Sequence, residues 1–459
     1  MVKISQLNKL IVIALITFIL SACGGGGGGG GSSSTGAIAD PSDDSITVGG
    51  VGSLTYSPDS CSEDDQKAFI YKAMHDVYYW SGQTPDLDYT AYASQDALLD
   101  ALKYDTYDKW SYVIPKTTYN AYYAGDNVGL GVTMGISAGT NEIFLTHVYP
   151  GSPADLAGFQ RGYSLTAVNG YTAAQMISDA NIYDTAFGPS EEGYSVDIDY
   201  IDNSSSAGSA TVVKDEYYAD SVAAYDIFTN GTNGKKIGYL SYLAFSGNYY
   251  TDMFPALSAF ETNGVEELVV DLRYNGGGLL SAAIFLSSQI GGSGLTSGLM
   301  YTYLHNTFYS AWNRSSYFSS PTYDLDISKI VFLVTSSSAS ASETVINNLL
   351  PYMDVTLIGS TTHGKPVGMY AFPYCDNYIV PISFKTVNAD NDGDYFGGMS
   401  VDCAASDDVT HQLGDEAEGM LSEAILYLET GTCTNPRAEQ GQGLESVRGN
   451  GINYVFNMR

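Results

Sequence analysis

The sequence predicts an α/β fold in which a helical segment and a β-rich segment precede the core. From Lys236 onward, apolar strand-like runs alternate with helix-like runs, a pattern typical of helices packed against a sheet. Residues 61–123 carry apolar side chains at helical spacing, whereas residues 124–218 combine short strand-like runs with glycine turns. The 459 residues are 44% hydrophobic and include 38 tyrosines, which supplies apolar material for several cores.

Two helices are expected in residues 61–123, the second beginning at Ser94. Their inward-facing residues recur at helical spacing: Phe69, Ile70, Ala73, Met74, Val77, Tyr78, Leu98, Leu99 and Leu102. Trp80 and Trp110 are interpreted as core anchors rather than as substrate contacts.

The α/β core is expected over residues 219–430, followed by a polar tail at 431–459. The expected strands are 236–245, 268–272, 330–334 and 355–358, and the expected helices are 253–260, 279–290 and 345–350. Gly276–Gly278 follows the second strand, where backbone amides can approach a substrate oxygen without obstruction by side chains. A plain strand-to-helix turn is the alternative.

The segment Thr335–Thr344 lies between a strand-like run and a helix-like run. A serine at such a turn presents its oxygen beside helix N-terminal amides, which can stabilise an oxyanion. Lys365, in a later Gly-Lys-Pro turn, could serve as the base. The alternative is structural, because Ser340 and Glu343 also form an S-x-x-E capping box and a lysine in a turn is usually solvated.

The run S-A-S-A-S-E at Ser338–Glu343 resembles the nucleophile segment of the carboxy-terminal processing (tail-specific) serine peptidases. The resemblance implies that Ser340 is the nucleophile and that Lys365, 25 residues later, is its base. The run D-L-R-Y-N-G-G-G-L at Asp271–Leu279 likewise resembles the family's oxyanion turn, which implies backbone donors at Gly277 and Ala341. The likeness extends over residues 61–430 and implies a crotonase-like α/β peptidase core.

Two positions depart from the family pattern. Met369 stands where relatives carry a glutamine that orients the lysine, so we expect a Ser–Lys dyad without that third member, or with one supplied from elsewhere. Gly276 stands where the family usually has a proline in the oxyanion turn. The backbone donor is therefore either Gly277 or the residue next to it.

Residues 124–218 resemble a PDZ domain. Val128–Val132 (V-G-L-G-V) is similar to the loop whose amides receive a peptide's terminal carboxylate, which implies substrate contacts at Gly129, Leu130 and Gly131. In such a domain an extended peptide adds to an exposed strand edge. A β-rich spacer with tight turns is the alternative.

Residues 1–22 have the pattern of an export signal. Lys3 and Lys9 precede an apolar run at 10–20, which is shorter than the ~20 residues that span a membrane. The ending L-S-A-C resembles a bacterial lipobox, which implies cleavage before Cys23 and acylation of its thiol. A cleaved signal with a stray cysteine is the alternative. We expect a lipoprotein of the bacterial cell envelope, anchored to the outer membrane and facing the periplasm or the cell surface.

Residues 23–60 are expected to be a flexible tether. Eight glycines (Gly24–Gly31) lead into serines, with no preceding strand or closing lysine to indicate a phosphate loop. The 37 residues from 24 to 60 would reach roughly 35 Å on average. The formal net charge of −32 becomes −34 when Lys3 and Lys9 leave with the signal, which argues against nucleic acid as a partner.

No cofactor or metal is expected. The histidines form no H-E-x-x-H pattern and the cysteines form no C-x-x-C pair. The stretch Asn388–Gly393 opens like a calcium loop, but Met399 stands where the bidentate glutamate belongs. Four cysteines besides Cys23 allow three disulfide pairings, and the sequence does not choose among them. Cys375 with Cys403 would clip one region, whereas Cys61 with Cys433 would tie together the ends of the folded body.

The predicted function is that of a membrane-tethered serine endopeptidase acting on exported proteins or peptides with accessible C-terminal tails. A neutral lysine base requires the pKa of Lys365 to fall by about three units, or roughly 4 kcal/mol. We therefore expect an apolar, closed site with no carboxylate beside the amine. Alternatives are an inactive peptide-binding lipoprotein scaffold, an adhesive surface protein, and a Ser–His arrangement with His363 as the base.

Overall fold

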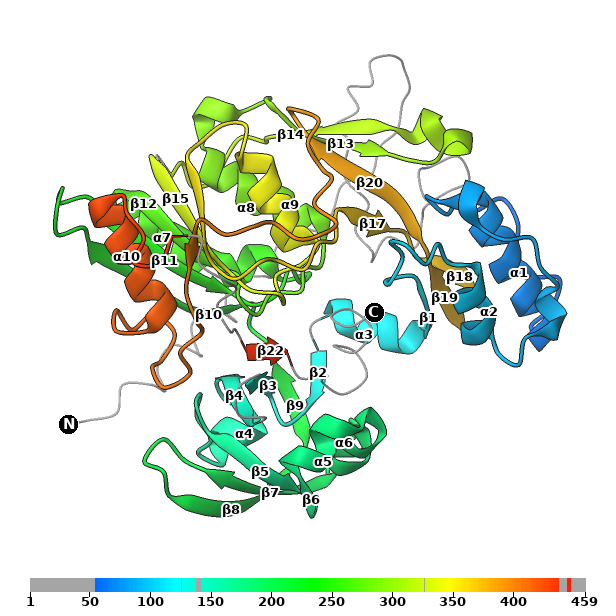
Figure 1. Cartoon of the computed structure of the whole chain (residues 1–459), viewed down its shortest axis with the longest axis horizontal. Helices are drawn as coiled ribbons and strands as arrows, with labels where there is room; N and C mark the ends of the chain where they lie inside the picture. The colour runs from blue at the N-terminus through cyan, green and yellow to red at the C-terminus, as the bar shows by residue number, and fades with distance from the viewer. Residues whose placement is uncertain (1–53, 125, 138–141, 326, 437–443, 447–459) are drawn as a thin grey trace, which may run out of the picture. The chain divides into compact units, whose positions relative to one another are not determined.

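The computed structural model describes residues 54–436 and 444–446, except 125, 138–141 and 326 (Figure 1). The expected signal peptide, Cys23 and residues 23–53 of the expected tether lie outside the described residues. Within the described part of the chain, no helix combines the length and apolarity needed to span a bilayer.

A six-stranded sheet forms the centre of the core, in the order β10-β11-β12-β15-β16-β21. Its strands are β10 (Val222–Thr229), β11 (Lys236–Tyr242), β12 (Val265–Asp271), β15 (Lys329–Val334), β16 (Val355–Gly359) and β21 (Cys403–Ala404). All neighbours run parallel except the edge strand β10, which is antiparallel to β11. Parallel strands need both faces covered, and their continuous apolar runs reflect this.

Helices cover both faces of this sheet. One face packs against α7 (Tyr249–Asn263), α8 (Leu280–Gly291) and α9 (Ala341–Leu349), and the other against α10 (Gly419–Thr430). Alternate residues of one strand serve the two sides: Phe332 belongs to the cluster with α9, whereas Val331 and Leu333 belong to the cluster with α10. The predicted α/β class is confirmed.

The helical segment shares its hydrophobic core with strands of the α/β part of the chain. It contains α1 (Glu63–Asp76), two 3-10 turns (Ser81–Gln83 and Tyr89–Ala91), α2 (Gln95–Leu102), β1 (Tyr112–Pro115) and α3 (Lys116–Ala124). Phe69, Trp80 and Trp110 pack in one buried cluster with Val367 and Ile382. Ser94 caps α2 as expected, its hydroxyl accepting from Ala97 N.

Two smaller sheets connect the helical segment to the core. One has the order β14-β13-β20-β17 and the other β1-β19-β18. Their strands are β13 (Leu299–Leu304), β14 (Arg314–Tyr317), β17 (Val367–Met369), β18 (Phe372–Tyr374), β19 (Asn377–Val380) and β20 (Ile382–Asn388), with 3-10 turns at Ser293–Leu295 and Thr307–Trp312. Because β1 pairs with β19, the helical segment is hydrogen-bonded to the strands that follow Lys365.

Residues 124–218, here named the PDZ-like domain after the sequence-based prediction, form antiparallel strands with three short helices in their described part. The strands are β2 (Asp126–Gly129), β3 (Val132–Ser137), β4 (Ile143–Val148), β5 (Ser164–Val168), β6 (Tyr171–Thr172), β7 (Ser195–Ile201), β8 (Ala207–Val213) and β9 (Asp215–Tyr218); the helices are α4 (Pro153–Leu156), α5 (Ala173–Ser178) and α6 (Ala180–Phe187). The main sheet runs β22-β3-β4-β5-β7-β8, and its edge strand β22 (Leu444–Ser446) comes from the C-terminal tail.

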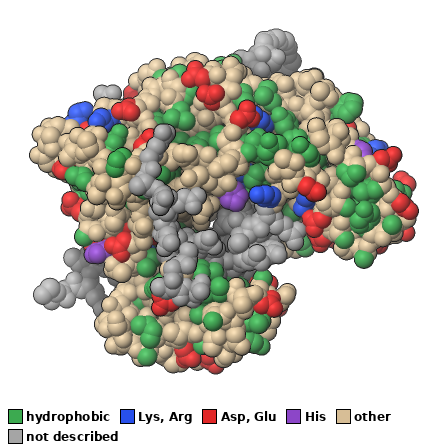
Figure 2. All heavy atoms as spheres, viewed as in Figure 1, with side chains coloured by type: hydrophobic (Ala, Val, Ile, Leu, Met, Phe, Trp, Pro, Cys, Tyr) green, Lys and Arg blue, Asp and Glu red, His purple; other side chains and the backbone are tan. Residues whose placement is uncertain are grey.

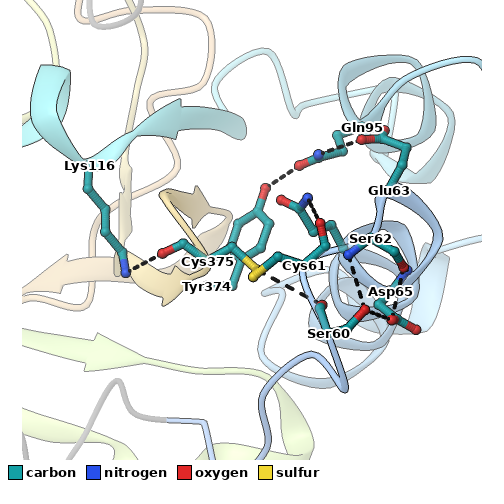
Figure 3. Close-up of a disulfide and its surroundings, with 10 residues drawn as sticks. Ser60, Cys61, Ser62, Glu63, Asp65, Gln95, Lys116, Tyr374 and Cys375 are labelled. Carbon is teal, nitrogen blue, oxygen red and sulfur yellow. Dashed lines mark hydrogen bonds between the residues drawn. A yellow bond between two sulfur atoms is a disulfide. The ribbon is translucent and has the colours of Figure 1, made fainter.

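The described residues contain two disulfides, Cys61–Cys375 and Cys403–Cys433. This is one of the three possible pairings, and it contains neither of the two bridges singled out from the sequence. Figure 3 shows the disulfide joining Cys61, two residues before α1 begins, to Cys375 in the turn between β18 and β19, where Lys116 Nζ also donates to Cys375 O at 2.8 Å. The bridge therefore fixes the start of the helical segment to the same strands that β1 pairs with.

On the face shown in Figure 2, acidic side chains are scattered and basic ones are few, in keeping with 51 Asp and Glu against 19 Lys and Arg. The calcium-like stretch forms a tight turn instead of a cage, since Asn388 Oδ1 accepts from the amides of Asp390 and Asp392. The only group of potential metal ligands among the described residues is Cys403, Glu423 and Cys433, whose two thiols are joined as a disulfide.

Candidate active site

Ser340 lies where the buried helix α9 meets the surface. It is half-buried, whereas every residue of α9 is buried. Its backbone has φ 56° and ψ −113°, a conformation that costs a non-glycine residue free energy and persists only when its surroundings impose it. The preceding turn supplies that constraint, because Ser338 Oγ donates to Leu272 O at 2.7 Å and accepts from Thr335 N at 3.0 Å. The predicted nucleophile is therefore held in a strained, defined position.

The predicted oxyanion donors lie beside Ser340. A Cβ atom on Gly277 would lie 2.8 Å from Ser340 Cβ and 3.0 Å from Ala341 N, so this position, at φ +103°, admits glycine only. Ala341 is the first residue of α9, and its amide has no acceptor within the helix. The Gly277 amide donates to Asn275 Oδ1 at 2.9 Å, so it is engaged within its own turn. Ser340, Gly277 and Ala341 therefore lie together, but the Gly277 amide already donates to the side chain of Asn275.

Asn275 connects the glycine turn to the nucleophile segment, a role that the sequence analysis missed. Its buried side chain donates to Tyr242 O at 2.8 Å. Its carbonyl accepts from Ser342 Oγ at 2.8 Å and from Ala339 N at 3.2 Å. These bonds join the ends of β11 and β12 to the start of α9. The sequence did contain a sign of this role, because Asn275 lies within the motif Asp271–Leu279.

Lys365 is buried in the turn between β16 and β17. Burial lowers the pKa of its amine to about 8, while the charges of Asp108 and Glu343 oppose that shift. Its Nζ lies 5.7 Å from the centroid of the Trp110 ring. The expectation of a closed site is confirmed, and no ion pair to Lys365 Nζ forms among the described residues, although the charges of Asp108 and Glu343 still act on the amine. The two carboxylates keep the pKa higher than burial alone would.

Glu343 bonds to both predicted catalytic segments. Its Oε2 accepts from Ser340 N at 3.0 Å and from Lys365 N at 2.8 Å. Its Oε1 accepts from Gly364 N and from Thr362 Oγ1, both at 2.6 Å. The sequence predicted a cap or surface carboxylate; the bond to Ser340 N is that of the cap, but the side chain is fully buried. One carboxylate thus fixes the serine backbone relative to the lysine backbone.

His363 is bound in a way that does not favour its use as the base. Indole Nε1 of Trp110 only donates, so His363 Nε2 accepts from it at 3.1 Å and the ring proton lies on Nδ1, 3.3 Å from Ser336 O. Burial, followed by the charge of Lys365, lowers the pKa of His363. Its lone pair is therefore occupied by Trp110.

A buried charge network supports the turn that carries Gly277. Arg273 bonds to Asp271, to Asp407 and to both oxygens of Glu418, at distances of 2.6–3.2 Å. From the PDZ-like domain, Arg161 donates to Tyr274 Oη at 2.6 Å and to Asp407 at 3.1 Å. Neighbouring carboxylates raise the pKa of Arg273 against the effect of its burial, so the guanidinium stays charged. The glycine turn is thus linked to the PDZ-like domain through two arginines.

Comparison with known proteins shows which family the chain is similar to. Residues 236–402 match peptidase family S41, and residues 65–112 match the peptidase S41 N-terminal domain. The core is similar to S41 peptidases over the matched residues. The predicted likeness to carboxy-terminal processing serine peptidases is thereby confirmed, and the matched range contains Ser340, Lys365 and Gly277.

Curated relatives of the S41 domain are distant. The chain is 26% identical over 298 residues to a CtpA-like serine protease of Staphylococcus aureus, covering 65% of this chain and 55% of that protein. It is 28% identical over 267 residues to a carboxyl-terminal-processing protease of Synechocystis, covering 56% and 58%. The chain therefore spans just over half the length of the curated relatives it matches.

A solved S41 protease of Bacteroides fragilis shares the fold. It superposes with a TM-score of 0.62 at 24% identity, covering 83% of this chain and 99% of that one.

The predicted peptide-binding loop of the PDZ-like domain lies between β2 and β3. Leu130 is buried, and its carbonyl accepts from Ala154 N at 2.9 Å. Gly131, at φ +76°, packs so tightly that a Cβ atom there would lie 2.1 Å from Ser152 Cβ. Gly129 ends β2, opposite Asp215 of β9. The three residues form one connection at the start of β3.

Met369 lies in β17, with Ile382 as its partner in β20. Its thioether is at most a weak hydrogen-bond acceptor, so it cannot substitute for the amide of a glutamine. Around Lys365 the structure instead places Asp108 and Trp110, which come from the helical segment. The sequence analysis missed this contribution because these residues are more than 250 positions away along the chain.

Proposed function

We propose that this chain is a serine endopeptidase with Ser340 as nucleophile and neutral Lys365 as general base. The observation that carries the proposal is Glu343, which binds the backbone amides of both residues and so fixes a strained serine relative to a buried amine. The S41 domain match supports the same reaction class. At pH 7, a pKa of about 8 leaves about one amine in ten neutral, against roughly one in 3,000 at 10.5.

In the proposed reaction, Lys365 Nζ takes the proton of Ser340 Oγ as that oxygen bonds to a peptide carbonyl carbon. The resulting oxyanion accepts from Ala341 N and from the Gly277 turn, each donor contributing about 3 kcal/mol. The peptide C–N bond then breaks, and the Lys365 ammonium returns its proton to the leaving amine. A water molecule, deprotonated by the same amine, hydrolyses the acyl-enzyme and regenerates the serine. For Gly277 to donate, its amide must share or leave Asn275 Oδ1.

Substrates in this proposal are proteins or peptides with accessible C-terminal tails, which the PDZ-like domain binds through Gly129–Gly131 and the edge of β3. The chain would act from an outer-membrane lipid anchor on Cys23, facing the periplasm or the cell surface. The test is cleavage of synthetic peptides that differ only at their carboxyl ends, by the chain from residue 54 onward. We expect cleavage that depends on the carboxyl end and is lost in Ser340→Ala and in Lys365→Ala. An unchanged rate in either variant contradicts the dyad, and binding without cleavage favours the scaffold alternative.

A further inference from the structure

The C-terminal tail of the chain occupies the edge of the PDZ-like sheet. Its strand β22 runs antiparallel to β3, pairing Leu444 with Ser137, Glu445 with Ile136 and Ser446 with Gly135. In the sheet order, β22 is the outermost strand and β3 is the next. Backbone groups of β3 that would otherwise form an open edge are therefore hydrogen-bonded to the chain's own tail.

This edge is where a peptide would be expected to bind. The strand β3 follows directly on the loop Gly129–Gly131, and an extended peptide that adds to it would use the same row of backbone groups. Because β22 is antiparallel to β3, the tail runs from Ser137 toward Gly135, that is, toward the loop. A peptide whose terminal carboxylate binds that loop must run in the same direction. The tail therefore has the orientation of such a ligand and occupies the half of β3 farther from the loop, Gly135–Ser137.

The tail is fastened to the core shortly before it reaches β3. Cys433 is bonded to Cys403, and Ala404 N donates to Asn435 O at 3.1 Å. Seven residues separate Pro436 from Leu444, a stretch that can reach at most about 28 Å. Short connections of this kind give effective concentrations in the millimolar range. A self-affinity of only about 100 µM would then keep the edge occupied about nine-tenths of the time.

We propose that the C-terminal tail is an intramolecular ligand of the PDZ-like domain, which substrate tails must displace before they can bind. This inference rests on the proposed function only in treating the β3 edge as the substrate-binding edge. It makes substrate recognition competitive: only peptides that bind β3 more tightly than the tethered tail are retained. Because the tail leaves only about one edge in ten free, the apparent affinity for an added peptide falls about tenfold.

The test is a binding measurement that needs no catalysis. The probe is a fluorescent synthetic peptide of residues 441–450, titrated against Ser340→Ala protein that either is complete or ends at Gly443. We expect the truncated protein to bind the probe at least tenfold more tightly. Equal affinity for both proteins, or no binding to the truncated one, overturns the proposal. Because Ser340 is absent from both proteins, this result is separate from loss of peptidase activity, which the cleavage assay reports.

Matched proline variants locate the effect. Glu445→Pro removes an amide donor from β22 and should bind the probe as the truncated protein does. Gln440→Pro carries the same substitution outside β22 and should bind as the complete chain does; equal affinities of the two variants contradict the proposal. A hundredfold dilution of the complete chain should leave its affinity for the probe unchanged. A rise in affinity on dilution would show that the tail of one copy binds the β3 edge of another, which would overturn the intramolecular assignment.

Discussion

Replacing Glu343 with glutamine should weaken the link between the segment that carries Ser340 and the segment that carries Lys365. Four donors meet the two oxygens of this buried carboxylate: the amides of Ser340, Gly364 and Lys365, and the hydroxyl of Thr362. Glutamine keeps one oxygen and turns an NH2 group toward the other two donors. Each buried donor left without an acceptor costs about 1–3 kcal/mol, so two cost about 2–6 kcal/mol.

Relief of the buried charge offsets part of this cost, since burial raises the pKa of Glu343. We expect a net loss of about 2–4 kcal/mol in the free energy of unfolding. Turnover should fall at least a hundredfold, because small displacements of reacting groups have effects of about that size. Loss of the negative charge also removes one cause that raises the pKa of Lys365, so the pH midpoint of the remaining activity should move below that of the wild type.

The assays are urea unfolding followed by circular dichroism and peptide cleavage measured across pH. Asp354→Asn is the matched control, because Asp354 is an exposed carboxylate in the turn before β16. It should change the unfolding free energy by no more than about 0.5 kcal/mol and leave turnover unchanged. A Glu343→Gln variant with wild-type stability and wild-type turnover would refute the role assigned to this carboxylate. An unshifted pH midpoint would refute its coupling to Lys365.

Three further predictions concern buried charges. Because the base must be neutral, kcat/KM should rise about tenfold per pH unit below about 8 and level off above it; a profile flat from pH 6 to 9 contradicts this. Lys365→Met should abolish cleavage yet raise the unfolding free energy at pH 7 by about 3 kcal/mol, the equivalent of lowering the pKa from 10.5 to about 8. That gain should diminish as pH rises from about 8 to 10.5, because the unfolded lysine then also loses its proton; a gain independent of pH up to 11 would contradict the assignment. Asp407→Asn leaves Arg161 without its buried counter-charge and removes one of the three carboxylates around Arg273, and should cost about 3–5 kcal/mol in urea unfolding; a loss below 1 kcal/mol would show that the network is not essential.

Local sequence patterns predicted those parts of the molecule that depend on neighbouring residues. The helix beginning at Ser94 and the strand-to-turn-to-helix run around Ser340 follow from caps and apolar periodicity. The motifs that resemble the peptidase family also predicted Lys365 as the base before any geometry was known. Burial of that lysine was expected on chemical grounds, because a charged amine cannot act as a base.

Contacts between distant parts of the chain were not predictable in this way. Trp110 reaches His363 from the helical segment, and Arg161 reaches Asp407 from the PDZ-like domain, each across more than 240 residues. Disulfide pairing depends in the same way on which turns meet in space, and four cysteines alone gave three equal choices. The pairing of β22 with β3 carries no sequence signature, since a three-residue strand made by backbone bonds places few demands on side chains.

The most direct test of the Ser–Lys assignment is the rate at which a fluorophosphonate labels the chain as a function of pH. Mass spectrometry of the labelled protein should place the adduct on Ser340, with a labelling rate that has its pH midpoint near 8 and reaches a plateau above it. The adduct should be absent from Lys365→Met, which should remain folded by circular dichroism. Labelling of another residue, or undiminished labelling of Ser340 in folded Lys365→Met, would contradict the assignment.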